Sequence, residues 1–82
     1  MIVLFKNKNV DGSLNVCGKN IKFLRKEMRL SQRELADKIQ LLGIDIGKNA
    51  IQQIESGKRF VTDIELKTFS AFFNICVSKM LE

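Results

Sequence analysis

The chain has 82 residues, of which 45% are hydrophobic, and this size and composition are typical of one globular domain and argue against disorder. It contains no His, which excludes a Cys/His zinc site and catalysis by His, and no apolar stretch is long enough to span a membrane. The formal net charge is +5. The two cysteines, Cys17 and Cys76, lie far apart and lack the spacing of metal ligands. We therefore expect a cytoplasmic protein with reduced thiols, no metal and no cofactor.

The first 17 residues differ from the rest of the chain. Residues 2–5 are strand-forming, Asp11-Gly12 is a turn signal, and apolar and polar residues alternate over 13–17. One interpretation is a β-hairpin that pairs about residues 2–6 with 13–17 and packs on the helices or on a second subunit; the other is a flexible arm. We therefore separate residues 1–17, an arm or hairpin, from a helical domain over residues 18–82.

Two helices are expected next. Helical periodicity predicts the first over about residues 20–28. Its inward face is expected to hold Ile21, Leu24, Arg25 and Met28. Ser31 and Glu34 form a capping box, which starts the second helix at Gln32. Its buried face is expected to hold Leu35, Ala36, Ile39 and Leu42, with Gly43 as its end.

A third helix follows a connection over residues 44–47, whose two isoleucines we expect to turn inward. The helix is predicted over about residues 48–56, with Ile51 and Ile54 on its buried face. Gly57 is expected to close it in the left-handed conformation.

The last part of the chain predicts two more helical segments. Thr62 and Glu65 form a second capping box and begin a fourth helix. Its core-facing residues are expected to be Ile64, Leu66, Phe69 and Phe73. Ser78 is expected to cap a last turn over residues 79–82. Together these segments predict an all-α fold of short helices.

The sequence shows no constellation typical of an enzyme. Glu34 and Asp37 are the only paired acids at a plausible spacing, and we interpret them as charges on a helix surface. Ser31 and Thr62 are explained as helix caps and have no candidate base. No Gly-rich phosphate loop is present. We expect no enzymatic activity.

The third helix is the candidate DNA-contacting element. With its isoleucines turned inward, it exposes Lys48, Asn49, Gln52 and Gln53. Asn and Gln side chains form paired hydrogen bonds with adenine, and Lys reaches guanine acceptors or phosphate. An ordinary polar helix surface is the alternative interpretation.

The charge distribution agrees with a polyanionic partner. Ten of the 14 basic residues and five of the nine acidic residues lie within residues 19–59, which therefore carry the whole net charge of +5. Gln32 and Arg33 begin the second helix, whose backbone N–H groups and dipole favour a phosphate. Lys58 and Arg59 follow the third helix and are expected to hold another phosphate. A solvated basic face without a partner is the alternative.

The motifs occur in the order Leu30-Ser31-Gln32-Arg33-Glu34-Leu35-Ala36, Ile51-x-x-Ile54-Glu55-x-Gly57-Lys58-Arg59 and Glu65-Leu66. This order resembles the Cro/phage-repressor (xenobiotic-response-element type) helix-turn-helix family over about residues 18–82. The resemblance implies a lambda-repressor-like bundle of five short helices. Its second and third helices would form the DNA-binding unit of a homodimer on a two-fold operator.

The resemblance also implies roles for individual residues. Gln32 matches the family position that bonds a phosphate, and base contacts are implied for Lys48, Asn49 and Gln53. A semi-buried ion pair between Arg25 and Glu55 is implied as well. The inward placement of Arg25 agrees with it, because an arginine–carboxylate pair is the common way to satisfy such charges.

One departure concerns the connection between the second and third helices. Residues 40–47 make it several positions longer than is usual in the family, so either the second helix is extended or the turn is wider. Residues 1–17 match nothing in the family core. We predict a sequence-specific, double-stranded-DNA-binding transcriptional repressor; the alternative is a protein-interaction module of the same fold, such as an antitoxin or adaptor.

Overall fold

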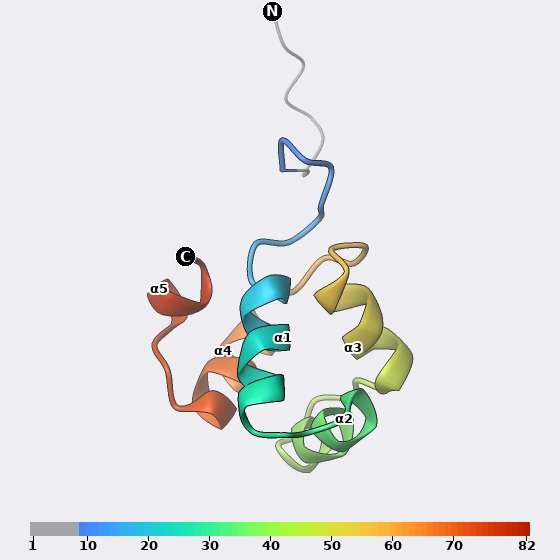
Figure 1. Cartoon of the computed structure of the whole chain (residues 1–82). Coiled ribbons are helices and arrows are strands. Elements are labelled where there is room, and N and C mark those ends of the chain that lie inside the picture. Colours follow the sequence, from blue (N-terminus) through green and yellow to red (C-terminus); the bar gives the residue numbers. More distant parts are fainter. Residues whose placement is uncertain (1–8) are drawn as a thin grey trace, which may run out of the picture.

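The computed structural model describes residues 9–82, and this part of the chain folds into five short helices without a strand. The helices are α1 (Gly18–Glu27), α2 (Gln32–Leu41), α3 (Lys48–Glu55), α4 (Asp63–Phe73) and α5 (Val77–Met80). In Figure 1, α1 is seen between α3 on one side and α4 and α5 on the other, with α2 below. The predicted all-α, five-helix class is confirmed. None of the described helices has both the length and the hydrophobicity needed to cross a membrane.

Both capping boxes are present and start their helices as predicted. The Ser31 hydroxyl accepts a hydrogen bond from the Glu34 N–H at 3.0 Å, and the Glu34 carboxylate accepts one from the Ser31 N–H at 2.8 Å. Thr62 and Glu65 make the same reciprocal pair at 3.1 and 3.0 Å. Because each box satisfies two N–H groups that the helix leaves free, it defines where α2 and α4 begin.

All five helices contribute to one buried core. Its members are Cys17, Ile21, Leu35, Ala36, Ile39, Ile46, Ile51, Ile54, Phe69 and Met80. Two of them, Cys17 and Ile46, come from loops rather than helices. Since α3 buries Ile51 and Ile54 completely, its opposite face must point to solvent.

Three predicted core residues are exposed instead. Met28 is 47% and Leu42 52% exposed, because each follows the last residue of its helix and the chain then turns through a positive φ, at Arg29 and Gly43 respectively. Ile64 is 65% exposed. It precedes the buried Phe69 by five residues, which places it about 140° away around the helix axis.

The connection between α2 and α3 is a widened turn rather than an extended helix. α2 ends at Leu41, and residues 42–47 link it to α3. Ile46 inserts into the core, and the Gln40 side chain donates a hydrogen bond to the Ile46 carbonyl at 2.9 Å. The widened turn is therefore held in place by one buried side chain and one side-chain hydrogen bond.

The two ends of the chain depart from expectation. Residues 13–17 form a loop, and the proposed partner strand, residues 2–6, lies outside the described residues. The last helix begins two residues earlier than predicted, with Cys76 rather than Ser78 at its N-cap.

Candidate nucleic-acid interface

The exposed face of α3 carries the four side chains expected to contact bases. Lys48, Asn49, Gln52 and Gln53 all lie at the surface. Within residues 9–82 their side chains make no hydrogen bond or ion pair to the rest of the chain, so their donors and acceptors face solvent.

The Arg25 and Glu55 side chains meet in a nearly buried ion pair that joins α1 to α3. Arg25 Nε lies 2.7 Å from Glu55 Oε2, Arg25 Nη2 lies 3.1 Å from Glu55 Oε1, and each residue is 8% exposed. Arg25 Nη1 also donates to the Leu30 carbonyl at 2.7 Å. Such a bidentate pair holds both the distance and the orientation between two helices.

Gln32 connects this pair to α2. Its amide Nε2 donates to Glu55 Oε1 at 3.1 Å, so the first residue of α2 is bound to the last residue of α3. The amide keeps a second N–H and its own oxygen for another partner. The first turn of α2 and the polar face of α3 are therefore held in a defined relation.

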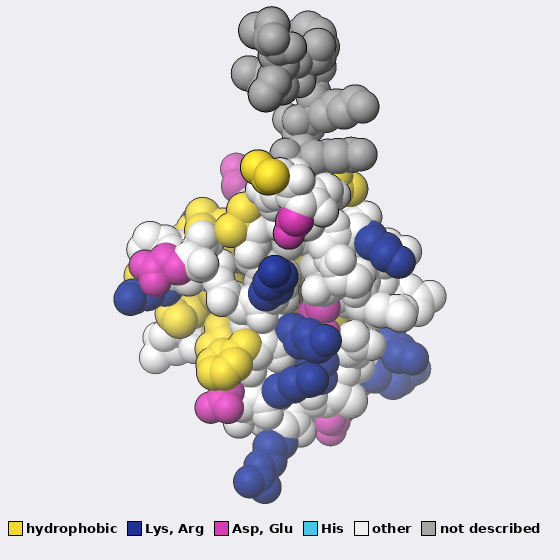
Figure 2. Space-filling view, turned by 45° about the horizontal axis from the view of Figure 1, so that its top comes forward, with side chains coloured by type: hydrophobic (Ala, Val, Ile, Leu, Met, Phe, Trp, Pro, Cys, Tyr) yellow, Lys and Arg dark blue, Asp and Glu magenta, His cyan; other side chains and the backbone are white. Residues whose placement is uncertain are grey.

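The basic residues expected to bind phosphate differ in their surroundings. Arg33 and Lys58 are exposed. Arg59 is half-buried and forms a bidentate pair with Glu65, at 2.9 and 3.0 Å, across the start of α4. The hydrogen bond from Arg59 is the main reason that the pKa of Glu65 lies below its usual value. On the face shown in Figure 2, further Lys and Arg side chains gather over α1.

Residues 9–17, here called the N-terminal loop, support the end of α3. Asn15 Nδ2 donates to the carbonyls of Ile54 at 3.0 Å and Arg59 at 2.8 Å, and Asn15 Oδ1 accepts from the Gly18 N–H at 2.7 Å. The Leu14 N–H donates to the Gly57 carbonyl at 2.8 Å. Sequence reasoning missed Asn15; an Asn three residues before a helix is a possible cap signal, but nothing local indicates its bonds to residues 54 and 59.

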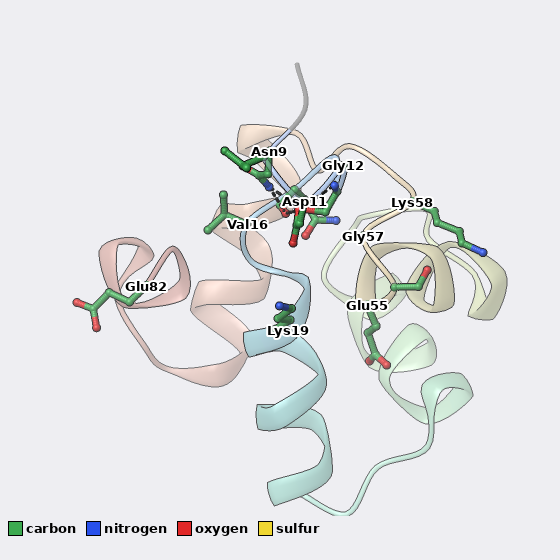
Figure 3. Close-up of a pocket in the computed structure, with 13 residues that line it drawn as sticks. Asn9, Asp11, Gly12, Val16, Lys19, Glu55, Gly57, Lys58 and Glu82 are labelled. Atoms are coloured by element: carbon green, nitrogen blue, oxygen red, sulfur yellow. Dashed lines mark hydrogen bonds between the residues drawn. The ribbon is translucent and has the colours of Figure 1, made fainter. Parts of the chain in front are cut away.

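A groove of about 790 Å³ lies between the N-terminal loop, the start of α1 and the end of α3. Figure 3 shows Lys19 and Lys58 on two sides of it, with Gly57 and Glu55 between them. Gly57 has a φ of +79°, and a Cβ there would lie 2.8 Å from the Ser13 Cβ, so only glycine fits the contact between the loop and α3.

The two cysteines are both free, Cys17 in the core and Cys76 at the surface. Burial raises the pKa of the Cys17 thiol, which keeps it protonated and unreactive. The described residues contain no group of His, Cys, Asp or Glu able to hold a metal ion.

A family model described as helix-turn-helix matches residues 21–76, from α1 to the residue before α5. Among curated proteins and solved structures, none matches the chain. The matched segment contains the α3 face, the Arg25–Glu55 pair and Lys58, whereas the N-terminal loop lies before it.

Proposed function

The chain belongs to the Cro/phage-repressor type of helix-turn-helix protein, a family of DNA-binding regulators, and from this premise we propose that it is a sequence-specific transcriptional repressor. One observation carries the proposal: α3 buries its isoleucines completely and presents four uncommitted polar or cationic side chains on the other face. A short helix with this division is suited to enter the major groove and contact base edges.

In the proposed complex α3 lies in the major groove. Gln52 and Gln53 form paired hydrogen bonds to adenine, and Lys48 and Asn49, in the first turn of α3, contact guanine or adenine. Because the widened turn sets where α3 begins, the positions of these first-turn residues depend on it more than that of Gln53.

Phosphate contacts flank the base contacts of α3 in the DNA major groove. Gln32 and Arg33 offer side chains beside the free N–H groups at the start of α2, where the helix dipole favours an anion. Lys58 extends from the other end of α3. Arg59 retains its pair with Glu65 and uses its remaining N–H groups for phosphate.

We also propose that the protein acts as a cytoplasmic homodimer, with residues 18–82 as the DNA-binding domain. Three exposed apolar side chains support the presence of a subunit contact: Ile64 on α4, Val77 on α5 and Leu81 directly after α5. The alternative function, an interaction module such as an antitoxin or adaptor, is favoured by one feature, the adjacent exposed residues Leu41 (85%) and Leu42 (52%).

The experiment is a selection of bound sequences from random duplex DNA, followed by mobility shifts on the selected site. Lys48→Ala and Gln53→Ala should each weaken binding about 5- to 150-fold, the effect of about 1–3 kcal/mol per base contact. Lys67→Ala, an exposed lysine of α4, is the matched control and should bind as the wild type does. A palindromic consensus supports the dimer, and no retardation even at low salt would refute DNA binding.

A further inference from the structure

We propose that three lysines of α1, Lys19, Lys22 and Lys26, form a second phosphate-binding surface that contacts the DNA backbone beside the segment held by α3. This surface is called the α1 basic row. The inference rests on the proposed function and extends it to a helix that has no assigned contact with DNA. Figure 2 shows Lys and Arg side chains following one another over α1 on the face that it presents.

The row lies on the flank of α1 that adjoins α3. Its members are exposed and spaced by three and four residues, which places them on one side of the helix. Lys22 is about 60° around the axis from Arg25, whose side chain reaches Glu55 of α3. The opposite flank of α1 faces α5, where the Asn20 side chain donates to the Met80 carbonyl at 2.7 Å.

The groove connects the row to the proposed phosphate contacts of α3. Lys19, the first member of the row, lines the groove together with Ser56, Gly57 and Lys58 from the end of α3 (Figure 3). A DNA backbone that passes Lys58 therefore meets Lys19 next, without crossing an intervening helix. From Lys19 to Lys26 the helix rises by about 10 Å, which matches the axial rise of about three phosphates on one strand.

No salt bridge within residues 9–82 neutralises the row, although the pKa of Asp11 is lowered by hydrogen bonds from Ser13 and, to a lesser degree, by the charge of Lys19. The ion pairs there engage Arg25, Arg59 and Lys79, and none includes a member of the row. The one acid of α1, Glu27, lies about 100° around the axis from Lys26. Across the groove, Asp11 is bound to the Ser13 N–H and hydroxyl at 3.0 and 2.8 Å.

The α1 basic row lowers the stability of the protein when no DNA is bound. Lys22 and Lys26 are like charges at i,i+4, and Lys19 stands in the first turn of α1, where the helix dipole disfavours a cation and no acid is present. Binding to a phosphate backbone relieves both unfavourable terms, because it places negative charge against all three lysines at once.

The test compares two triple variants of the full chain that remove the same charge. The first is Lys19→Gln/Lys22→Gln/Lys26→Gln; the control, Lys38→Gln/Lys67→Gln/Lys79→Gln, changes exposed lysines of α2, α4 and α5. Affinity for a random-sequence duplex pool of about 30 base pairs is measured against salt concentration. Each lost phosphate contact lowers the slope of log K against log[salt] by about 0.9, so the row variant should lose about 2 to 3 and the control nearly nothing.

The possible results separate the two proposals. If the wild type does not bind the pool at low salt, the proposed function and this inference both fail. If the wild type binds and the row variant keeps its slope, or both variants lose slope equally, only the α1 basic row is refuted. Thermal melts check the fold: the row variant should melt at or above the wild-type temperature, because a repulsive set of charges has been removed.

Discussion

Replacing Glu55 by Ala should strongly destabilise the protein, because it breaks the buried ion pair with Arg25. The substitution removes both oxygens that bind Arg25 and leaves its guanidinium, in a residue only 8% exposed, with the Leu30 carbonyl as its remaining partner. It also removes the acceptor of the Gln32 amide. An uncompensated buried charge is costly because little water reaches it.

The size of the effect follows from this burial. Breaking a buried pair by removing one partner costs about 3–5 kcal/mol, and we expect about 3 kcal/mol because the Leu30 carbonyl remains. For a domain of this size each kcal/mol shifts the melting temperature by about 4–8 °C, so the variant should melt about 12–24 °C lower. The midpoint of urea unfolding should fall by about 1–3 M.

The assay is a pair of urea and thermal unfolding curves for Glu55→Ala and for Glu82→Ala. Glu82 also faces a lysine, but its contact with Lys79 is 3.6 Å long and both side chains are more than half exposed, so its loss should be undetectable. A Glu55→Ala curve that coincides with the wild-type curve would mean that the pair does not stabilise the fold. The reasoning from burial would then be wrong.

Three further outcomes are expected. Asn15→Ala removes three hydrogen bonds, to Gly18 of α1, Ile54 of α3 and Arg59 after α3, and should lower the free energy of unfolding in urea by about 1–3 kcal/mol. An unchanged midpoint would show that the N-terminal loop does not support α3. Gly18→Ala should destabilise the protein in the same assay, although Ala is the better helix former, because its Cβ would lie 2.1 Å from the Ile54 carbonyl oxygen; a gain in stability would contradict the packing. The folded-state pKa of Glu65 is lowered, mainly by the hydrogen bond from Arg59, so the carboxylate stabilises the fold above its usual pKa of 4.5 and this stabilisation is lost as the pH falls through the folded-state pKa. Glu65→Gln should therefore reduce the fall in melting temperature below about pH 4.5. An identical pH profile of the melting temperature in variant and wild type would count against the pair.

Local sequence was sufficient for the helices and for most of the core. Capping boxes at Ser31 and Thr62 act within four residues of chain, so their effect is visible without knowing the rest of the fold. The spacing of Ile51 and Ile54 likewise determines which face of α3 is buried and which is exposed. Where the periodic pattern ran past a helix end, as at Leu42, it wrongly placed an apolar residue in the core.

Tertiary structure decided how these helices are joined and braced. Asn15 bonds to residues 54 and 59, about 40 positions away, and Ile46 enters the core from a turn whose length alone allowed two conformations. Arg59 was expected to hold a phosphate, and the sequence did not indicate that its guanidinium also pairs with Glu65. Such contacts depend on where distant segments pack, because a hydrogen bond or an ion pair selects its partner by distance in space, whereas caps and helical periodicity select by distance along the chain.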